Sequence, residues 1–281
     1  DMGSVHLHAA LLDPAGKVVE AFRIPIQGRP DEAFAQAFVR LAPLCGSAPI
    51  AVGATGIGRD LLRCARGIHA ENEIAACGLA GRALAPWARG IVEVGGHFSK
   101  WVVLGQDGDV RECALNELCA AGSGAFLEQQ AGRMELGLEK MSALAAGAQK
   151  GAAVAGRCSV FAKSDMIHLQ QKGTPAGEIA YGLCLALARN YAATVLKGQE
   201  LAKPIAFVGG CAANAGLLRA FQEVLLLGPE DLRVPERHDA FGAVGAALSA
   251  AQSAQRFWTL EELSKELSIV RTKSEAVSSF A

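Results

Sequence analysis

The chain has 281 residues, of which 51% are hydrophobic and 20% are charged, and its net charge is −1. This length suits one large or two medium domains, and the composition is that of a globular chain rather than a disordered one. A net charge this small excludes a general basic field for nucleic acid or acidic lipid, so neither is an expected partner.

The longest uncharged stretches do not predict a membrane span. The stretch 41–58 contains two prolines and several glycines, and 240–255 is mostly alanine and glycine. A span needs about 20 predominantly apolar residues in a row. With no signal-peptide or Arg-rich targeting pattern, we expect a cytoplasmic protein that does not enter the membrane.

Two segments of the chain match each other at a constant offset of 92 residues. Asp1-Met2-Gly3-Ser4 corresponds to Glu93-Val94-Gly95-Gly96, and each motif is followed by a strand, a turn and a second strand. The turns at 13–16 and 106–109 suit hairpins. Two such hairpins can aim backbone N–H groups and a carboxylate at phosphates and Mg²⁺, gripping a nucleotide from both sides. Two ordinary hairpins of an α/β protein are the alternative.

Between the two copies, hydrophobic spacing and turn residues predict three helical segments, one strand and one turn. In chain order they are a helix over 31–41, a strand over 50–54, a turn at 55–59, and helical segments around 59–65 and 72–85.

After the second copy, the sequence is mainly helical. Expected are helices over 124–132, 159–171, 176–196, 217–224 and 242–255, a buried strand over 205–208, and a polar helix with a frayed tail at the end. In the helix expected over 176–196, five apolar residues recur every four positions and predict a buried face. They are Ile179, Leu183, Leu187, Tyr191 and Val195. The duplicated order of strands and helices predicts two α/β domains with a cleft between them.

A third glycine element, Gly209-Gly210, follows the buried strand and precedes a helix. Glycines there let a flat ligand such as adenine or ribose approach the backbone. Asn214, near the start of that helix, can donate or accept a hydrogen bond. A tight strand-to-helix turn would explain the same residues.

Eight cysteines without CxxC spacing do not predict disulfides in a chain of this length. Most lie in apolar settings, where a thiol behaves as a small hydrophobe. Cys119 and Cys158 differ, because each precedes a predicted helix whose N-terminus favours a thiolate. Two thiolates cannot complete the four that a cubane iron–sulfur cluster needs, but two chains related by a twofold axis can. Two buried structural thiols are the alternative.

Several motifs together resemble a known family, the ATP-dependent activators of 2-hydroxyacyl-CoA dehydratases and the related ATPase subunits of benzoyl-CoA reductase. That family belongs to the acetate kinase, sugar kinase, Hsp70 and actin superfamily. The resemblance covers about residues 1–252 and is carried by Asp1-Met2-Gly3-Ser4, Thr55-Gly56-Ile57-Gly58-Arg59, Asn72-Glu73-Ile74, residues 93–100, 116–124, 157–162, Phe207-Val208-Gly209-Gly210 and 242–246.

The resemblance implies two duplicated actin-like, ribonuclease H-like α/β domains with a nucleotide cleft between them. The first domain would cover 1–88 and be completed by a C-terminal helix over 241–258. The second would cover 89–240 and carry both cysteines, and 259–281 would be a polar tail.

The resemblance also implies the roles of individual residues. Cys119 and Cys158 would bind one [4Fe-4S] cluster shared across a homodimer, and Asp1 and Glu93 would handle Mg²⁺ and the attacking water. The other residues expected to bind ATP or ADP are Gly3, Ser4, Gly95, Gly96, His97, Ser99, Lys100, Gly122, Ser123, Gly124, Gly209, Gly210 and Asn214.

The function implied is that of an ATPase that passes a low-potential electron from its cluster to an acyl-CoA dehydratase or reductase, with ferredoxin or flavodoxin as donor. The chain departs from the family pattern at 5–8 and at His97-Phe98, where a Gln-Asp pair is usual, and Glu93 stands for aspartate. These features resemble a variant branch found as one domain of fused activators, and the start at Asp1 predicts part of a longer protein. A small-molecule kinase and a non-hydrolysing nucleotide-binding regulatory domain are the alternatives.

Overall fold

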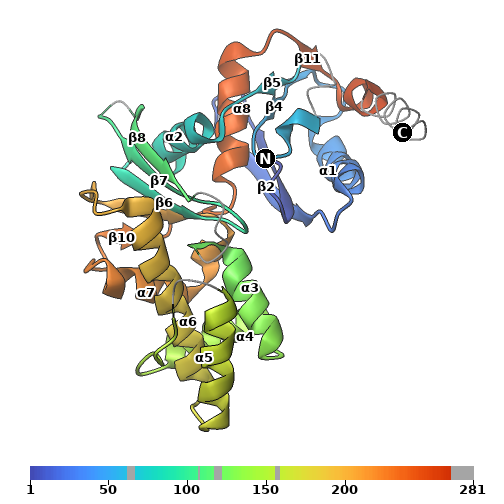
Figure 1. Ribbon diagram of the computed structural model, residues 1–281. Coiled ribbons are helices and arrows are strands. Elements are labelled where there is room, and N and C mark those ends of the chain that lie inside the picture. Colours follow the sequence, from blue (N-terminus) through green and yellow to red (C-terminus); the bar gives the residue numbers. More distant parts are fainter. Residues whose placement is uncertain (62–66, 107, 117–121, 156–158, 267–281) are drawn as a thin grey trace, which may run out of the picture. The chain divides into compact units, whose positions relative to one another are not determined.

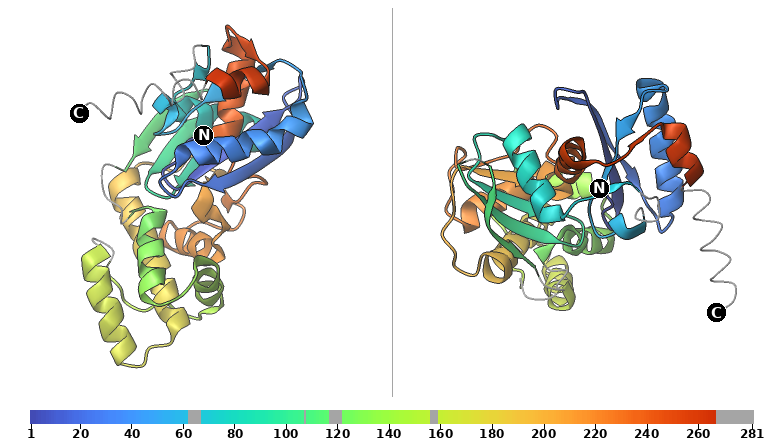
Figure 2. Two further views of the ribbon diagram at one scale, coloured as in Figure 1. Left: turned by 90° about the vertical axis from the view of Figure 1, so that its right-hand side faces the viewer. Right: turned by 90° about the horizontal axis from the view of Figure 1, so that it is seen from above.

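The computed structural model describes residues 1–61, 67–106, 108–116, 122–155 and 159–266. The chain divides into two compact units (Figures 1 and 2). Unit 1 consists of Asp1–Ala83 and Ala240–Ala281, and unit 2 consists of Leu84–Asp239. Each unit has its own hydrophobic core.

Unit 1 begins with an antiparallel hairpin of β1 (His6–Leu12) and β2 (Val18–Pro25), which packs on helix α1 (Pro30–Cys45). Proline in the first turn of α1 and two acidic residues beside it suit a helix start. The helix extends four residues beyond the predicted 31–41, because Pro43 lies in its last turn and interrupts little there.

The rest of unit 1 is built on short strand pairs and two helices. The predicted strand 50–54 is split, since β3 (Ile50–Ala51) pairs with β11 (Phe257–Trp258) while β4 (Gly53–Ala54) pairs with β5 (His69–Ala70). The 3₁₀-helix η1 covers Arg59–Leu61, and the helices are α2 (Glu73–Leu84) and α8 (Phe241–Ser253). The polar helix over 260–266 starts with a capping box, in which Thr259 and Glu262 each accept the other's backbone N–H.

Unit 2 contains a five-stranded sheet in the order β10-β9-β6-β7-β8. Its strands are β6 (Gly90–Val94), β7 (Ser99–Leu104), β8 (Val110–Leu115), β9 (Ile205–Val208) and β10 (Leu232–Arg233). Its helices are α3 (Gly124–Arg133), α4 (Leu138–Gly147), α5 (Ser159–Gln171), α6 (Ala176–Tyr191), the π-helix η3 (Ala192–Leu196), the 3₁₀-helix η4 (Gly210–Ala213) and α7 (Ala215–Val224). Helices α3 to α6 extend away from the sheet (Figure 1).

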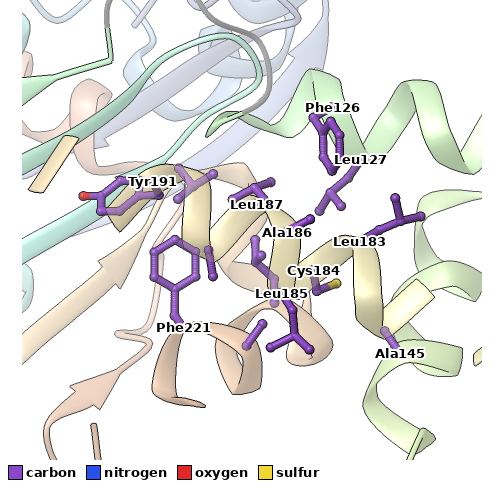
Figure 3. Close-up of a cluster of buried hydrophobic side chains, with 14 of the residues drawn as sticks. Phe126, Leu127, Ala145, Leu183, Cys184, Leu185, Ala186, Leu187, Tyr191 and Phe221 are labelled. Carbon is purple, nitrogen blue, oxygen red and sulfur yellow. The ribbon is translucent and has the colours of Figure 1, made fainter. Parts of the chain in front are cut away.

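Helix α6 is the centre of the core of unit 2. All five residues of the predicted face are fully buried, so the four-residue period is confirmed, and Figure 3 shows Leu187 near Phe126 and Tyr191 beside Phe221. Among the described residues, the 21-residue stretch Ala176–Leu196 is long and apolar enough to cross a membrane by length and composition, with a mean hydropathy of 1.3. Since 78% of that window is buried inside the protein, it has the character of a core helix.

The repeat predicted from the sequence is confirmed in the backbone of the two hairpins. His8 pairs with Arg23 in the first hairpin, and Lys100 pairs with Leu115 in the second. Each residue of the second pair lies 92 positions after its counterpart in the first. The register shifts between Leu11 and Leu12 in one hairpin and at the equivalent step between Val103 and Leu104 in the other. A bulge kept at the same step supports a common origin for the two copies.

Candidate functional site

Three glycine segments that are far apart in the sequence meet in unit 2. The carbonyl oxygens of Gly95 and Gly96 accept the N–H groups of Gly124, at 2.8 Å, and Ala125, at 2.6 Å. A Cβ placed on Gly124 would lie 2.6 Å from the sulfur of Cys211 and 3.0 Å from the oxygen of Gly95. The segments at 95–96, 122–124 and 209–211 therefore form one backbone-lined cluster, which we call the glycine cluster.

Gly209 joins this cluster to the end of β6. Its φ of 90° lies in the left-handed region, and a Cβ there would be 2.5 Å from the oxygen of Val94. His238 holds Gly209 twice, because its carbonyl accepts the Gly209 N–H at 2.8 Å and its Nδ1 lies 3.0 Å from the Gly209 oxygen. The side of Gly210 is open, since a Cβ there would meet nothing within 4 Å.

Glu93 and Lys100 form an ion pair beside the glycine cluster. They are opposite each other on β6 and β7, and the Lys100 Nζ lies 3.0 and 3.1 Å from the two carboxylate oxygens of Glu93. Lys100 is only 5% exposed, and its carbonyl accepts the hydroxyl of Tyr191 at 2.7 Å. Lys100, expected at the cofactor site, therefore neutralises the carboxylate expected to act there.

Ser99 ties the glycine turn to the segment that leads to the cysteine. Its backbone exchanges hydrogen bonds with Asn116, at 2.7 Å to the side chain and 3.0 Å from the backbone N–H. Its hydroxyl donates to the carbonyl of Gly122 at 2.6 Å. Ser99 is fully buried, and it holds the residues on both sides of 117–121. These bonds give Ser99 the role of holding Asn116 and Gly122 beside the turn 95–98.

Three other residues expected at the site have distinct environments in unit 2. Asn214 caps α7, because its side-chain oxygen accepts the N–H of Leu217 at 3.0 Å. Ser123 is buried at the start of α3, and His97 is exposed in the turn closed by Gly95 and Phe98.

Asp1, Gly3 and Ser4 lie in unit 1. The Asp1 carboxylate sits between Gly56 and Gly242, because a Cβ on either glycine would collide with it. The turn after it matches the one in unit 2, since the Gly3 N–H donates to the His6 carbonyl as the Gly95 N–H donates to that of Phe98. The backbone of Asp1 also exchanges two hydrogen bonds with His8, at 2.8 and 2.9 Å.

Replacing Gly242 by alanine is expected to displace the Asp1 carboxylate and leave the fold in place. The colliding atoms belong to the end of a side chain that can move, so thermal unfolding should shift little. If Asp1 acts in hydrolysis, misplacing it should lower the ATPase rate on the order of 10²-fold. Gly132→Ala in α3, where a Cβ meets nothing within 4 Å, is the matched control. An unchanged rate in Gly242→Ala would count against a role for Asp1.

A polar network in unit 1 was not identified from the sequence. The Ser249 hydroxyl donates to Glu71, and His69 Nε2 lies 2.9 Å from the same hydroxyl and 3.6 Å from Glu71. Burial opposes ionisation of Glu71, but hydrogen bonds from Ser249, the Asn72 N–H and His69 outweigh it and lower the pKa of the carboxyl. No local motif signals this group, because Ser249 is 178 residues from Glu71.

Five of the eight cysteines lie among the described residues, and they range from the buried Cys77 and Cys184 to the exposed Cys113. Burial raises the pKa of Cys184 and of Cys211 to about 12, so both are inert small hydrophobes, as expected for most of these thiols. Cys119 and Cys158 lie outside the described residues. The helices that follow them, α3 and α5, pack against each other. Within the described ranges, no three His, Cys, Asp or Glu side chains gather as a metal ion requires.

Comparison with known proteins gives concordant matches. The model of the BadF/BadG/BcrA/BcrD ATPase family matches residues 1–250. An activator of lactoyl-CoA dehydratase from Anaerotignum propionicum is 35% identical over 173 residues, which are 62% of this chain and 65% of that protein. The uncharacterized protein YjiL of Escherichia coli K12 is 31% identical over 88% of this chain and 94% of its own length.

The solved structure of a 2-hydroxyisocaproyl-CoA dehydratase activator from Clostridium difficile, with bound ADPNP, superposes with a TM-score of 0.81. It is 23% identical, and the match covers 90% of this chain and 92% of that one. This similarity confirms the predicted actin-like α/β fold.

Proposed function

This chain belongs to the BadF/BadG/BcrA/BcrD ATPase family, and we propose that it binds and hydrolyses Mg·ATP to activate an acyl-CoA dehydratase or a benzoyl-CoA-reductase-type protein. The observation that carries the proposal is the glycine cluster, in which three separate backbone turns meet beside Glu93. Relatives named as dehydratase activators support the same assignment.

The glycine cluster fits a nucleotide because its glycines have no side chain that would keep a ligand away from the backbone. The open side of Gly210 admits a flat group, and Gly95 and Gly96 bring backbone without side chains close after Glu93 in the chain. The bound nucleotide supplies the phosphoanhydride bond that is hydrolysed. In unit 2, Glu93 would hold Mg²⁺ or orient water, and Lys100 keeps its carboxylate in one position; in unit 1, Asp1 is proposed for the same chemistry.

We further propose that Cys119 and Cys158 of two chains hold one [4Fe-4S] cluster in a homodimer. Support comes from the short distance in sequence between each cysteine and the start of α3 or α5, whose positive ends favour thiolates. The cluster supplies a low-potential electron when bound. A ferredoxin or flavodoxin in the cytoplasm is the proposed donor.

Ser99 provides a physical connection between the two proposed sites. It directly follows the turn 95–98, and it holds both Asn116 and Gly122, which flank the Cys119 segment. A nucleotide that binds one arrangement of the turn more tightly would therefore also favour one position of Asn116 and Gly122. The effect can be no larger than the difference in nucleotide affinity between the two arrangements.

Iron content tests the cluster directly. Protein purified and reconstituted without oxygen should hold about four irons per two chains, and Cys119→Ser or Cys158→Ser should remove nearly all of them. Cys113→Ser is the control, because Cys113 is exposed on β8 and should not affect iron. Reconstituted wild-type protein without iron would rule out the redox function.

One observation favours a nucleotide-binding regulatory domain as the second candidate. The turn at 95–98 carries the exposed His97 and Phe98, so it offers no carboxylate or amide to a phosphate. Tight binding of Mg·ADP without measurable hydrolysis of Mg·ATP would support this candidate.

A further inference from the structure

A buried amide on α6 faces the glycine cluster, and no residue that the structure describes accepts a hydrogen bond from it. Asn190 is 8% exposed, and its Nδ2 makes no hydrogen bond with any described residue. A Cβ on Gly122 would lie 3.5 Å from this nitrogen, so the amide is directed at the loop that precedes α3. A buried polar group without a partner is costly, and in native structures it usually has a specific explanation.

The surroundings of Asn190 favour an anion as the missing partner. Helix α3 has ten residues, and the partial positive charge of its N-terminus attracts negative groups. The N–H groups of Gly124 and Ala125 in its first turn already donate to Gly95 and Gly96. An anion at this loop therefore needs a further donor, and the Asn190 amide is one.

The backbone around Asn190 is unusual and firmly held. Helix α6 passes directly into the π-helix η3, a rare form that is frequent at functional sites. There the Thr194 hydroxyl donates to the Asn190 carbonyl at 2.8 Å, and the neighbouring Tyr191 hydroxyl donates to Lys100. Among the described residues, the carbonyl of Asn190 thus has a partner, whereas its side-chain nitrogen has none.

We infer that the Asn190 side-chain amide donates a hydrogen bond to a phosphate oxygen of the nucleotide bound at Gly122-Ser123-Gly124. The inference rests on the proposed function, because it assigns one more contact to the same site. A nucleotide phosphate and a sulfur of an iron–sulfur cluster can both accept this hydrogen bond, because both are anionic acceptors.

The test compares stability with affinity in iron-free, chelator-treated protein, using Mg·ADP as the probe. Asn190→Leu removes an unpaired polar group, so the Tm of the free protein should stay the same or rise. The Kd for Mg·ADP, measured by calorimetry, should increase roughly tenfold or more, as expected for loss of a hydrogen bond to a charged group. Asn190→Asp keeps the shape and adds a negative charge, so its Kd should increase further.

Tyr181→Phe, on the same helix, is the matched control, and the opposite pattern is expected. It removes a hydroxyl that already donates to Glu223, so the Tm should fall while the Kd stays within about twofold. If Asn190→Leu fails to fold, Asn190→Asp alone decides the question, and an unchanged Kd there overturns the inference.

Other outcomes separate the possible explanations. A lower Tm with an unchanged Kd in Asn190→Leu would mean that the amide only supports the fold. An unchanged Kd together with a shifted midpoint potential of the reconstituted cluster would assign the amide to the cluster. Wild-type protein that does not bind Mg·ADP would overturn both the proposed function and this inference, whereas binding that Asn190→Leu leaves intact would overturn the inference alone.

Discussion

Replacing Gly209 by alanine is expected to lower the free energy of unfolding by about 3 kcal/mol or more, and nucleotide binding should be lost with it. The residue has a φ of 90°, which side chains rarely adopt, and its Cβ would lie 2.5 Å from the carbonyl oxygen of Val94. That oxygen belongs to a central strand of the sheet and cannot move away at low cost. Thermal unfolding followed by calorimetry measures the change.

Gly210→Ala is the matched control for Gly209→Ala. A Cβ at Gly210 meets nothing within 4 Å, so stability should change by less than about 1 kcal/mol. If a nucleotide lies against this open side, the added methyl group should still weaken Mg·ADP binding. Equal stability of the two variants would contradict the tight contact at Val94, and unaltered binding in Gly210→Ala would place the nucleotide elsewhere.

Replacing Lys100 by methionine is expected to cost about 2–3 kcal/mol of stability. The change removes an ammonium group that is 3.0 and 3.1 Å from the Glu93 oxygens, and the carboxylate loses this counter-charge in a mostly buried position. The side chain of Glu93 keeps 20% exposure, so the cost should be at the low end for a broken buried pair. ATPase activity should fall in the same variant, because Glu93 is no longer held in place.

A double-mutant cycle separates the ion pair from simple packing. Adding Glu93→Leu to Lys100→Met removes both charges, and much of the lost stability should return, since an apolar replacement of both partners is often close to neutral. Glu112→Gln on the exposed edge strand β8 is a control that should change little. Loss of less than about 1 kcal/mol in Lys100→Met would mean that the pair contributes no more than a surface ion pair.

Local patterns predicted the main elements of the fold. The four-residue period of α6 and the 92-residue repeat of the hairpins are both visible in the sequence, because a buried helix face and a duplicated register each leave a regular spacing. The split of 50–54 into β3 and β4 was not predictable in this way. Its cause is that the partners, β11 and β5, come from different parts of unit 1.

The candidate site was predictable only in part. The glycine segments at 95–96, 122–124 and 209–210 stand out because glycine is required where backbones approach closely. Asn190 and His238 do not stand out, since an asparagine in an apolar helix and a histidine in a loop have many ordinary explanations. Their importance comes from contacts with Gly122 and Gly209, which lie 68 and 29 residues away in the sequence.

The sequence by itself determined the family, the α/β class, the repeated hairpins and the residue types that a nucleotide site requires. These depend on local periodicity and on short motifs, which the order of residues records directly. The tertiary structure decided which polar groups are already engaged. It joins Lys100 to Glu93 and Ser99 to Gly122, while leaving the Asn190 amide without a partner among the described residues. Hydrogen bonding is satisfied in three dimensions, so whether a donor is available for a ligand follows only from the packed chain.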